Sequence, residues 1–188
     1  MNEYLKPIFE FLLTNLEENG IDYWVFGGIS IAAYAGEFIR TNKDVDIFVK
    51  NADFENSKLI LSDLCKQNNF ELIYHPLKEV NERPKVEIKV DGEERFSMIP
   101  IYQDNAMVGF KYPDKYGGNE GYPNNILERV ERNVSGYRFF TPGNEFIKDM
   151  FINHIKARPK KKKREEYQKD AKAILSPEEL SVLDWVIE

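Results

Sequence analysis

The sequence contains a single cysteine and two histidines among its 188 residues, and it has no long apolar run. The lone cysteine, Cys65, excludes an internal disulfide framework and favours a reducing, cytoplasmic location. Nowhere do the roughly 18 consecutive apolar residues of a membrane span occur, and charged residues within 1–16 argue against a signal peptide. His75 and His154 lack the partner spacing of a zinc site. We therefore expect a cytoplasmic protein without a membrane partner.

Aromatic residues, in contrast, are abundant. The chain has 13 Phe and 10 Tyr, and 42% of its residues are hydrophobic, which is enough to build a sizeable core. Disordered chains are poor in such residues, so this composition predicts a globular protein. The net charge of −6 argues against a nucleic-acid binder that is basic overall.

Basic charge is concentrated in one segment, residues 156–169. Eight bases and two acids give this segment a charge of +6, which leaves −12 for the rest of the chain. A charge run of this kind is most often a solvated helix face. A nucleic-acid patch is the weaker alternative because no aromatic residues interleave with the lysines. A third alternative is that the segment faces an acidic cleft and helps to hold a polyanion.

Hydrophobic periodicity and turn residues predict an α+β fold. The expected helices span residues 4–16, 29–36, 53–66, 141–156, a basic stretch ending near 175, and a last helix after the capping box at 176–179. The expected strands span residues 23–26, 44–49, 70–74, 85–90 and 94–101, the last two joined as a hairpin through Asp91-Gly92. A glycine-rich loop is expected over 112–125. The pattern predicts a sheet domain over residues 1–135 and a C-terminal helical lobe over 136–188.

Two aspartates on the second predicted strand are the first candidates for chemistry. Asp44 and Asp46 point to one face, while Val45 and Ile47 point to the core. Two adjacent carboxylates repel each other, so one pKa rises unless a cation lies between them. Such hard oxygen ligands suit Mg²⁺, which takes one or two carboxylates together with phosphate oxygens. An exposed Asp pair at a strand edge is the alternative.

A glycine pair precedes this strand at the start of a short helix. Gly27 and Gly28 would let a polyphosphate approach the backbone, and the helix N-terminus would offer free amides and a positive dipole end. Ser30 could add a hydroxyl donor, although a hydroxyl in the first turn also bonds to its own backbone.

Together, residues 23–28, Arg40 and Asp44-Val45-Asp46 resemble the nucleotidyltransferase superfamily with a polymerase-β-like core. The order is most similar to bacterial nucleotidyltransferases that modify lincosamides and aminoglycosides, and the resemblance covers residues 22–49. It implies a mixed sheet flanked by helices, with a C-terminal helical lobe.

The resemblance also implies a reaction. Asp44 and Asp46 would bind Mg²⁺ in a two-metal site, and Gly27, Gly28 and Ser30 would hold the phosphates of a nucleoside triphosphate. A nucleoside monophosphate, AMP from ATP in our hypothesis, would pass to an acceptor hydroxyl. A third carboxylate would complete the metal site and act as general base.

Glu87 is our candidate for that third carboxylate. Val86 and Ile88 point into the core, so Glu87 takes the opposite face of its strand, as Asp44 and Asp46 do on theirs. Antibiotic-modifying relatives often carry this acid on the following strand, where residues 96–100 have none. An exposed glutamate paired with Arg95 or a lysine is the equally weighted alternative.

Three cations are candidates for the phosphates: Arg40, Lys163 and Lys169. A loop salt bridge is the alternative for Arg40, and solvent exposure is the alternative for the lysines. The expected acceptor is a small molecule, with RNA as an alternative. A catalytically silent nucleotide-binding protein and a toxin-type enzyme that modifies RNA or protein are the alternative functions. The sequence leaves the acceptor and the oligomeric state open.

Overall fold

The computed structural model describes residues 2–76, 84–103, 107–109, 121–123 and 127–184. The helices and helical turns are η1 (Glu3–Leu5), η2 (Ile8–Leu13), α1 (Thr14–Glu18), α2 (Gly28–Ala35), η3 (Asn51–Asp53), α3 (Phe54–Asn68), α4 (Asn144–Ala157), η6 (Pro159–Lys163), α5 (Glu165–Ile174) and α6 (Pro177–Val182). The strands are β1 (Tyr23–Phe26), β2 (Val45–Lys50), β3 (Glu71–His75), β4 (Lys85–Val90), β5 (Glu93–Gln103), β6 (Met107–Gly109), β7 (Gly121–Pro123), β8 (Val130–Val134) and β9 (Tyr137–Thr141).

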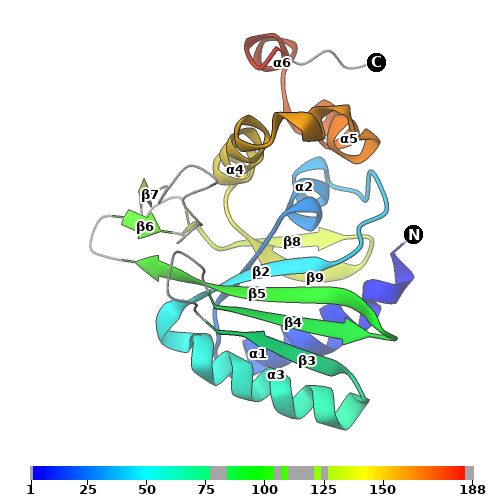
Figure 1. The fold of residues 1–188 in the computed structure, drawn as a ribbon, viewed down its shortest axis with the longest axis vertical. Coiled ribbons are helices and arrows are strands. Elements are labelled where there is room, and N and C mark those ends of the chain that lie inside the picture. Colours follow the sequence, from blue (N-terminus) through cyan, green and yellow to red (C-terminus); the bar gives the residue numbers. More distant parts are fainter. Residues whose placement is uncertain (1, 77–83, 104–106, 110–120, 124–126, 185–188) are drawn as a thin grey trace.

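The main sheet is mixed and has the strand order β1-β2-β5-β4-β3 (Figure 1). Strands β2 and β5 run parallel, and the other neighbours in this path are antiparallel. Short strands β6 and β7 extend it from β5. The expected α+β fold, with a mixed sheet flanked by helices, is thereby confirmed, as is the hairpin at Asp91-Gly92.

The N-terminal helix differs from its expected form. The periodicity predicts one helix over residues 4–16, whereas the structure has a 3-10 turn, a π-helix and a short α-helix in succession. Pro7 separates the first two because it has no backbone amide to donate. Where the π-helix gives way to α1, the Thr14 hydroxyl donates to the Phe9 carbonyl five residues earlier, at 3.2 Å.

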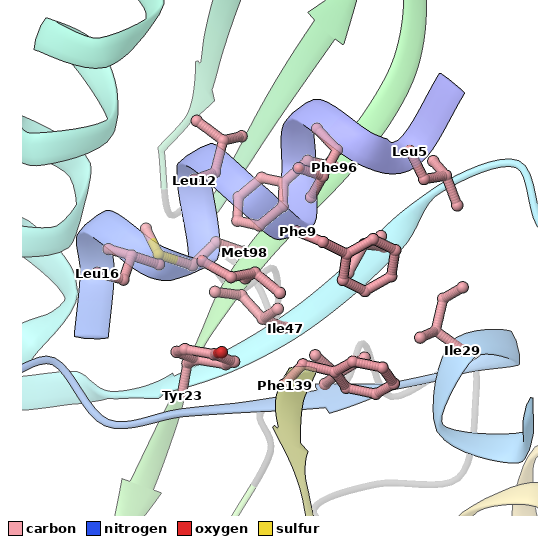
Figure 2. Close-up of a cluster of buried hydrophobic side chains, with 14 of the residues drawn as sticks. Leu5, Phe9, Leu12, Leu16, Tyr23, Ile29, Ile47, Phe96, Met98 and Phe139 are labelled. Carbon is pink, nitrogen blue, oxygen red and sulfur yellow. The ribbon is translucent and has the colours of Figure 1, made fainter. Parts of the chain in front are cut away.

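The core lies between this N-terminal segment and one face of the sheet (Figure 2). Leu5, Phe9, Leu12 and Leu16 of the segment point toward Ile47, Phe96 and Met98 of strands β2 and β5, with Phe139 of β9 beside them. All are 2% exposed or less. Because strand residues alternate between faces, burying Ile47 places Asp46 on the opposite face. The core thus fixes the direction in which the candidate site points.

Hairpin β8-β9 is an element that the sequence patterns did not predict. Its turn at 135–136 falls at the predicted boundary between the two domains, and its Val134 and Phe139 belong to the main core. On the other side, Ile31 of α2 packs in one buried cluster with residues of α4 and α5. Buried clusters thus contain residues from both sides of position 135, and α2 packs against the C-terminal helices. The division into two domains at residue 135 stays a prediction.

The C-terminal helices gather next to α2, at the end of the molecule away from α3 (Figure 1). The expected capping box is present, because Ser176 accepts from the Glu179 amide and the Glu179 carboxylate accepts from the Ser176 amide. Most of the predicted loop 112–125 lies outside the described residues, although 121–123 form β7. Within the described ranges, no helix combines the length and apolar character that crossing a bilayer requires.

Candidate functional site

The turn between β1 and α2 lies directly against a carboxylate of β2. Strand register pairs Phe26 with Asp46, so the chain that leaves β1 passes beside the Asp46 side chain. Gly27 has φ +68° and ψ −146°, a conformation that is essentially restricted to glycine. A Cβ at this position would stand 3.1 Å from Asp46 Oδ2. The backbone thus approaches the carboxylate at a distance that a side chain would prevent.

Gly28, the first residue of α2, is enclosed even more tightly. A Cβ here would stand 2.4 Å from Arg40 Nη2 and 2.5 Å from Asn42 Oδ1. Neither atom can retreat easily, because Arg40 is held by a buried partner and Asn42 is 2% exposed. We therefore expect Gly28→Ala to lower the free energy of unfolding by about 1–3 kcal/mol. Chemical denaturation measures this loss, and Gly136→Ala, at a turn with open space around it, separates steric from conformational effects.

A row of polar side chains crosses the face of the sheet that lies opposite the main core. Asp46 on β2 stands opposite Ser97 on β5, and Ser97 stands opposite Glu87 on β4. The Ser97 hydroxyl donates a short hydrogen bond to Asp46 Oδ1. Asp46 and Glu87 therefore share a face, as their parity predicts, but one strand lies between them. At about 4.8 Å per strand spacing, their backbones are roughly 10 Å apart.

A β-bulge adds a second glutamate to this face. The β4-β5 register shifts between Ile88 and Lys89, so that Ile88 pairs with Phe96 while Lys89 pairs with Glu94. Strict alternation would turn Glu94 away from Ser97, whereas the bulge returns it to the same face. Its charge then acts on Asp44, whose pKa is raised by burial first and by Glu94 second.

Lys85 is the cation among these acids. Its Nζ is 2.6 Å from Glu87 Oε1 and 3.0 Å from Glu94 Oε1, and its charge opposes the raised pKa values of Asp44 and Asp46. Glu87 also accepts from His75 Nε2 at 3.0 Å. Burial would raise the pKa of Glu87, but the hydrogen bonds from Lys85 and His75 outweigh burial and lower it.

Asp46 is the most strongly perturbed acid of the site. Burial raises its pKa, the Asp44 carboxylate raises it further, and the resulting value is about 6 despite the Ser97 hydrogen bond. Two half-buried carboxylates that repel each other are a suitable donor set for a hard divalent cation. Among the described residues, no group of three or more His, Cys, Asp or Glu side chains is close enough to hold a metal. The pair nevertheless fits Mg²⁺, which commonly takes one or two carboxylates plus substrate phosphates.

The predicted phosphate ligands occupy different places. Arg40 makes two bonds to Asp170 of α5, from Nε to Oδ1 at 2.7 Å and from Nη2 to Oδ2 at 2.9 Å, and Asp170 is 1% exposed. The Ser30 hydroxyl donates to the Gly27 carbonyl at 2.8 Å. Lys169 pairs with Glu165 at 2.7 Å on the exposed side of α5, and Lys163 is exposed on η6. The structure thus places Gly27 against Asp46 and Gly28 against Arg40, whose charge acts on Asp44, and it leaves both lysines on the surface.

Residues that the sequence analysis did not identify hold the loop before Asp44. Asn2 accepts from the Asn42 amide at 2.9 Å, and the Tyr4 hydroxyl donates to the Asn42 carbonyl. Arg95, at the bulge, donates to the Lys43 carbonyl at 3.1 Å. No spacing rule links positions 2, 4 and 95 to 42–43, because the contacts depend on the fold.

One family profile matches the N-terminal part of the chain. Residues 9–90 match the family profile of the aminoglycoside-2''-adenylyltransferases. A search of curated protein sequences finds no match.

Solved structures extend the likeness over almost the whole chain. Lincosamide antibiotic adenylyltransferase LnuA in its lincomycin-bound form superposes with a TM-score of 0.62 at 18% identity, covering 94% of this chain and 98% of LnuA. ANT(2'')-Ia in complex with adenylyl-2''-tobramycin gives 0.61 at 16% identity, covering 96% and 94%. A putative nucleotidyltransferase from Thermotoga maritima gives 0.58 at 13% identity, covering 85% and 89%. The chain therefore has the fold of these nucleotidyltransferases.

Proposed function

We propose that this protein is a Mg²⁺-dependent nucleotidyltransferase that transfers AMP from ATP to a hydroxyl of a small molecule. The observation that carries the proposal is the Asp44–Asp46 pair at the Gly27 turn, where burial and mutual repulsion raise the pKa of Asp46 to about 6. A cation bound there would relieve this repulsion. The acceptor class follows from structural neighbours that hold lincomycin and adenylyl-2''-tobramycin.

Each part of the site would have a defined task. Asp44 and Asp46 would hold Mg²⁺, which when bound supplies charge neutralisation for the triphosphate. The backbone of Gly27 and Gly28 would lie against the phosphates at the start of α2. The acceptor oxygen forms a bond to the α-phosphorus, the bond from that phosphorus to the β-phosphate oxygen breaks, and pyrophosphate leaves.

Glu87 is the proposed base, and it would take the proton of the acceptor hydroxyl. Its bonds to Lys85 and His75 lower its pKa, which makes it a weak base in the state described here. This observation favours a second candidate function, a silent protein that binds nucleotide without transferring it. Glu87→Gln distinguishes the two, because it leaves the shape of the side chain unchanged.

We expect wild type to release pyrophosphate when ATP and Mg²⁺ are supplied with a suitable acceptor, and Glu87→Gln to reduce kcat by about 10²–10⁴-fold. Lincomycin, tobramycin and total RNA serve as probe acceptors, and mass spectrometry detects the added nucleotide. Glu71→Gln, on the neighbouring strand and paired with Lys89, is the control and should retain activity. Full activity in Glu87→Gln would exclude the residue as base, whereas ATP binding without transfer by wild type to a broad acceptor set would favour the silent protein.

A further inference from the structure

On the face of the sheet that carries Asp46, the carboxylates outnumber the cations that contact them or act on them electrostatically. Asp44, Asp46, Glu87 and Glu94 supply four carboxylates. The charge of Glu94 acts on both aspartates, and Glu87 and Glu94 contact the same lysine. Arg40 lies nearby, but two of its nitrogens are bonded to Asp170.

Lys85 is positioned to balance this excess. Its ammonium bridges the two glutamates at 2.6 Å and 3.0 Å and acts electrostatically on both aspartates. A cation that neutralises carboxylates also competes with any other cation for them.

The Lys85 side chain is able to move. It is 32% exposed, and a lysine stem has four flexible carbons that let the ammonium swing away from its partners. Lys89, four residues along the same strand and on the same face, is also 32% exposed and pairs with Glu71 at 3.4 Å. The two lysines therefore differ mainly in the acids that they contact.

We propose that Lys85 is a built-in counter-ion that occupies the acidic face in the metal-free protein and leaves Glu87 and Glu94 when a divalent cation binds. This inference rests on the proposed metal site at Asp44 and Asp46. It makes Lys85 a positioning residue, which holds both glutamates in place until the metal arrives and sets the affinity for the metal.

Binding of Mn²⁺ alone tests the inference without any turnover. Electron paramagnetic resonance counts free Mn²⁺ in titrations of wild type, Lys85→Met, Lys89→Met and Asp46→Asn. Removing a positive charge that acts on both aspartates should tighten binding by about tenfold in Lys85→Met. Lys89→Met should stay within about twofold of wild type, and Asp46→Asn should bind at least tenfold more weakly.

A second readout uses wild type, so that it does not depend on the folding of a variant. Reductive methylation followed by peptide mass spectrometry reports how accessible each lysine amine is. Labelling of Lys85 should rise several-fold when Mg²⁺ is added, while labelling of Lys89 should stay constant.

The outcomes separate this inference from the proposed function. Binding by wild type that requires Asp46, with no gain in Lys85→Met and unchanged labelling of Lys85, overturns the counter-ion and leaves the metal site intact. Absence of Mn²⁺ binding in both wild type and Lys85→Met overturns the metal site and the counter-ion together.

Discussion

Asp46→Asn should melt at a higher temperature than wild type at pH 8 and lose most of this advantage near pH 4.5. Folding raises the pKa of Asp46 from 3.8 to about 6, so the folded state favours the protonated carboxyl. The contribution to stability is fully present below about pH 4 and is lost as pH rises through 6. The asparagine removes the buried charge, and we expect a gain of about 1–3 kcal/mol at pH 8.

Differential scanning calorimetry in metal-free buffer at the two pH values measures this effect. A gain of that size corresponds to a rise of roughly 2–4 °C per kcal/mol for a chain of this length. Asp63→Asn is the control, because Asp63 is exposed and pairs with Lys66 at 3.0 Å on the surface of α3. A variant at Asp46 that melts no higher than wild type at pH 8 would show that the carboxylate is stabilised in some other way.

Arg40→Met should destabilise the fold by about 3–5 kcal/mol. The Asp170 carboxylate is 1% exposed, and Arg40 makes two short bonds to it. Removing the arginine leaves a buried negative charge without its partner, which is far more costly than losing a surface pair. The substitution would also remove the guanidinium that packs against Gly28, and this would loosen the turn that lies against Asp46.

Arg138→Met is the matched control for this prediction. Arg138 also makes two bonds, at 2.9 Å and 3.0 Å, to Glu17, but its side chain is 50% exposed. Urea denaturation should show a much smaller loss of stability for this variant than for Arg40→Met, because water already screens an exposed pair. The double variant Arg40→Met/Asp170→Asn should recover part of the stability, because no buried charge remains. Equal losses of stability in Arg40→Met and Arg138→Met would show that burial of the ion pair does not determine its contribution.

The fold was largely predictable because its patterns are local. Strand parity places Asp46 and Glu87 on one face, and Asp91-Gly92 specifies the β4-β5 hairpin. Hairpin β8-β9 was missed, because Val130–Val134 carries three consecutive polar residues between its valines and so lacks a clear alternation of apolar and polar positions. The π-helix at Ile8–Leu13 was also missed, because its residues have ordinary helical periodicity.

The glycine turn and the aspartate pair were predictable because their spacing within residues 22–49 resembles a known family. The position of Glu94 was not, because it depends on a bulge that no sequence pattern specifies. The ion pair between Arg40 and Asp170 was not predictable either, because the two residues lie 130 positions apart in the chain. The contact of Lys85 with Glu94 also depends on the fold, because the two residues lie on different strands.

Calorimetric titration of ATP tests most directly whether Asp44 and Asp46 form a metal-dependent nucleotide site. The titrations use wild type and Asp46→Asn, each with Mg²⁺ and with EDTA. We predict that wild type binds ATP with Mg²⁺ at least tenfold more tightly than with EDTA, and that Asp46→Asn shows no such difference. Equal binding of ATP by both proteins, with or without Mg²⁺, would contradict the claim.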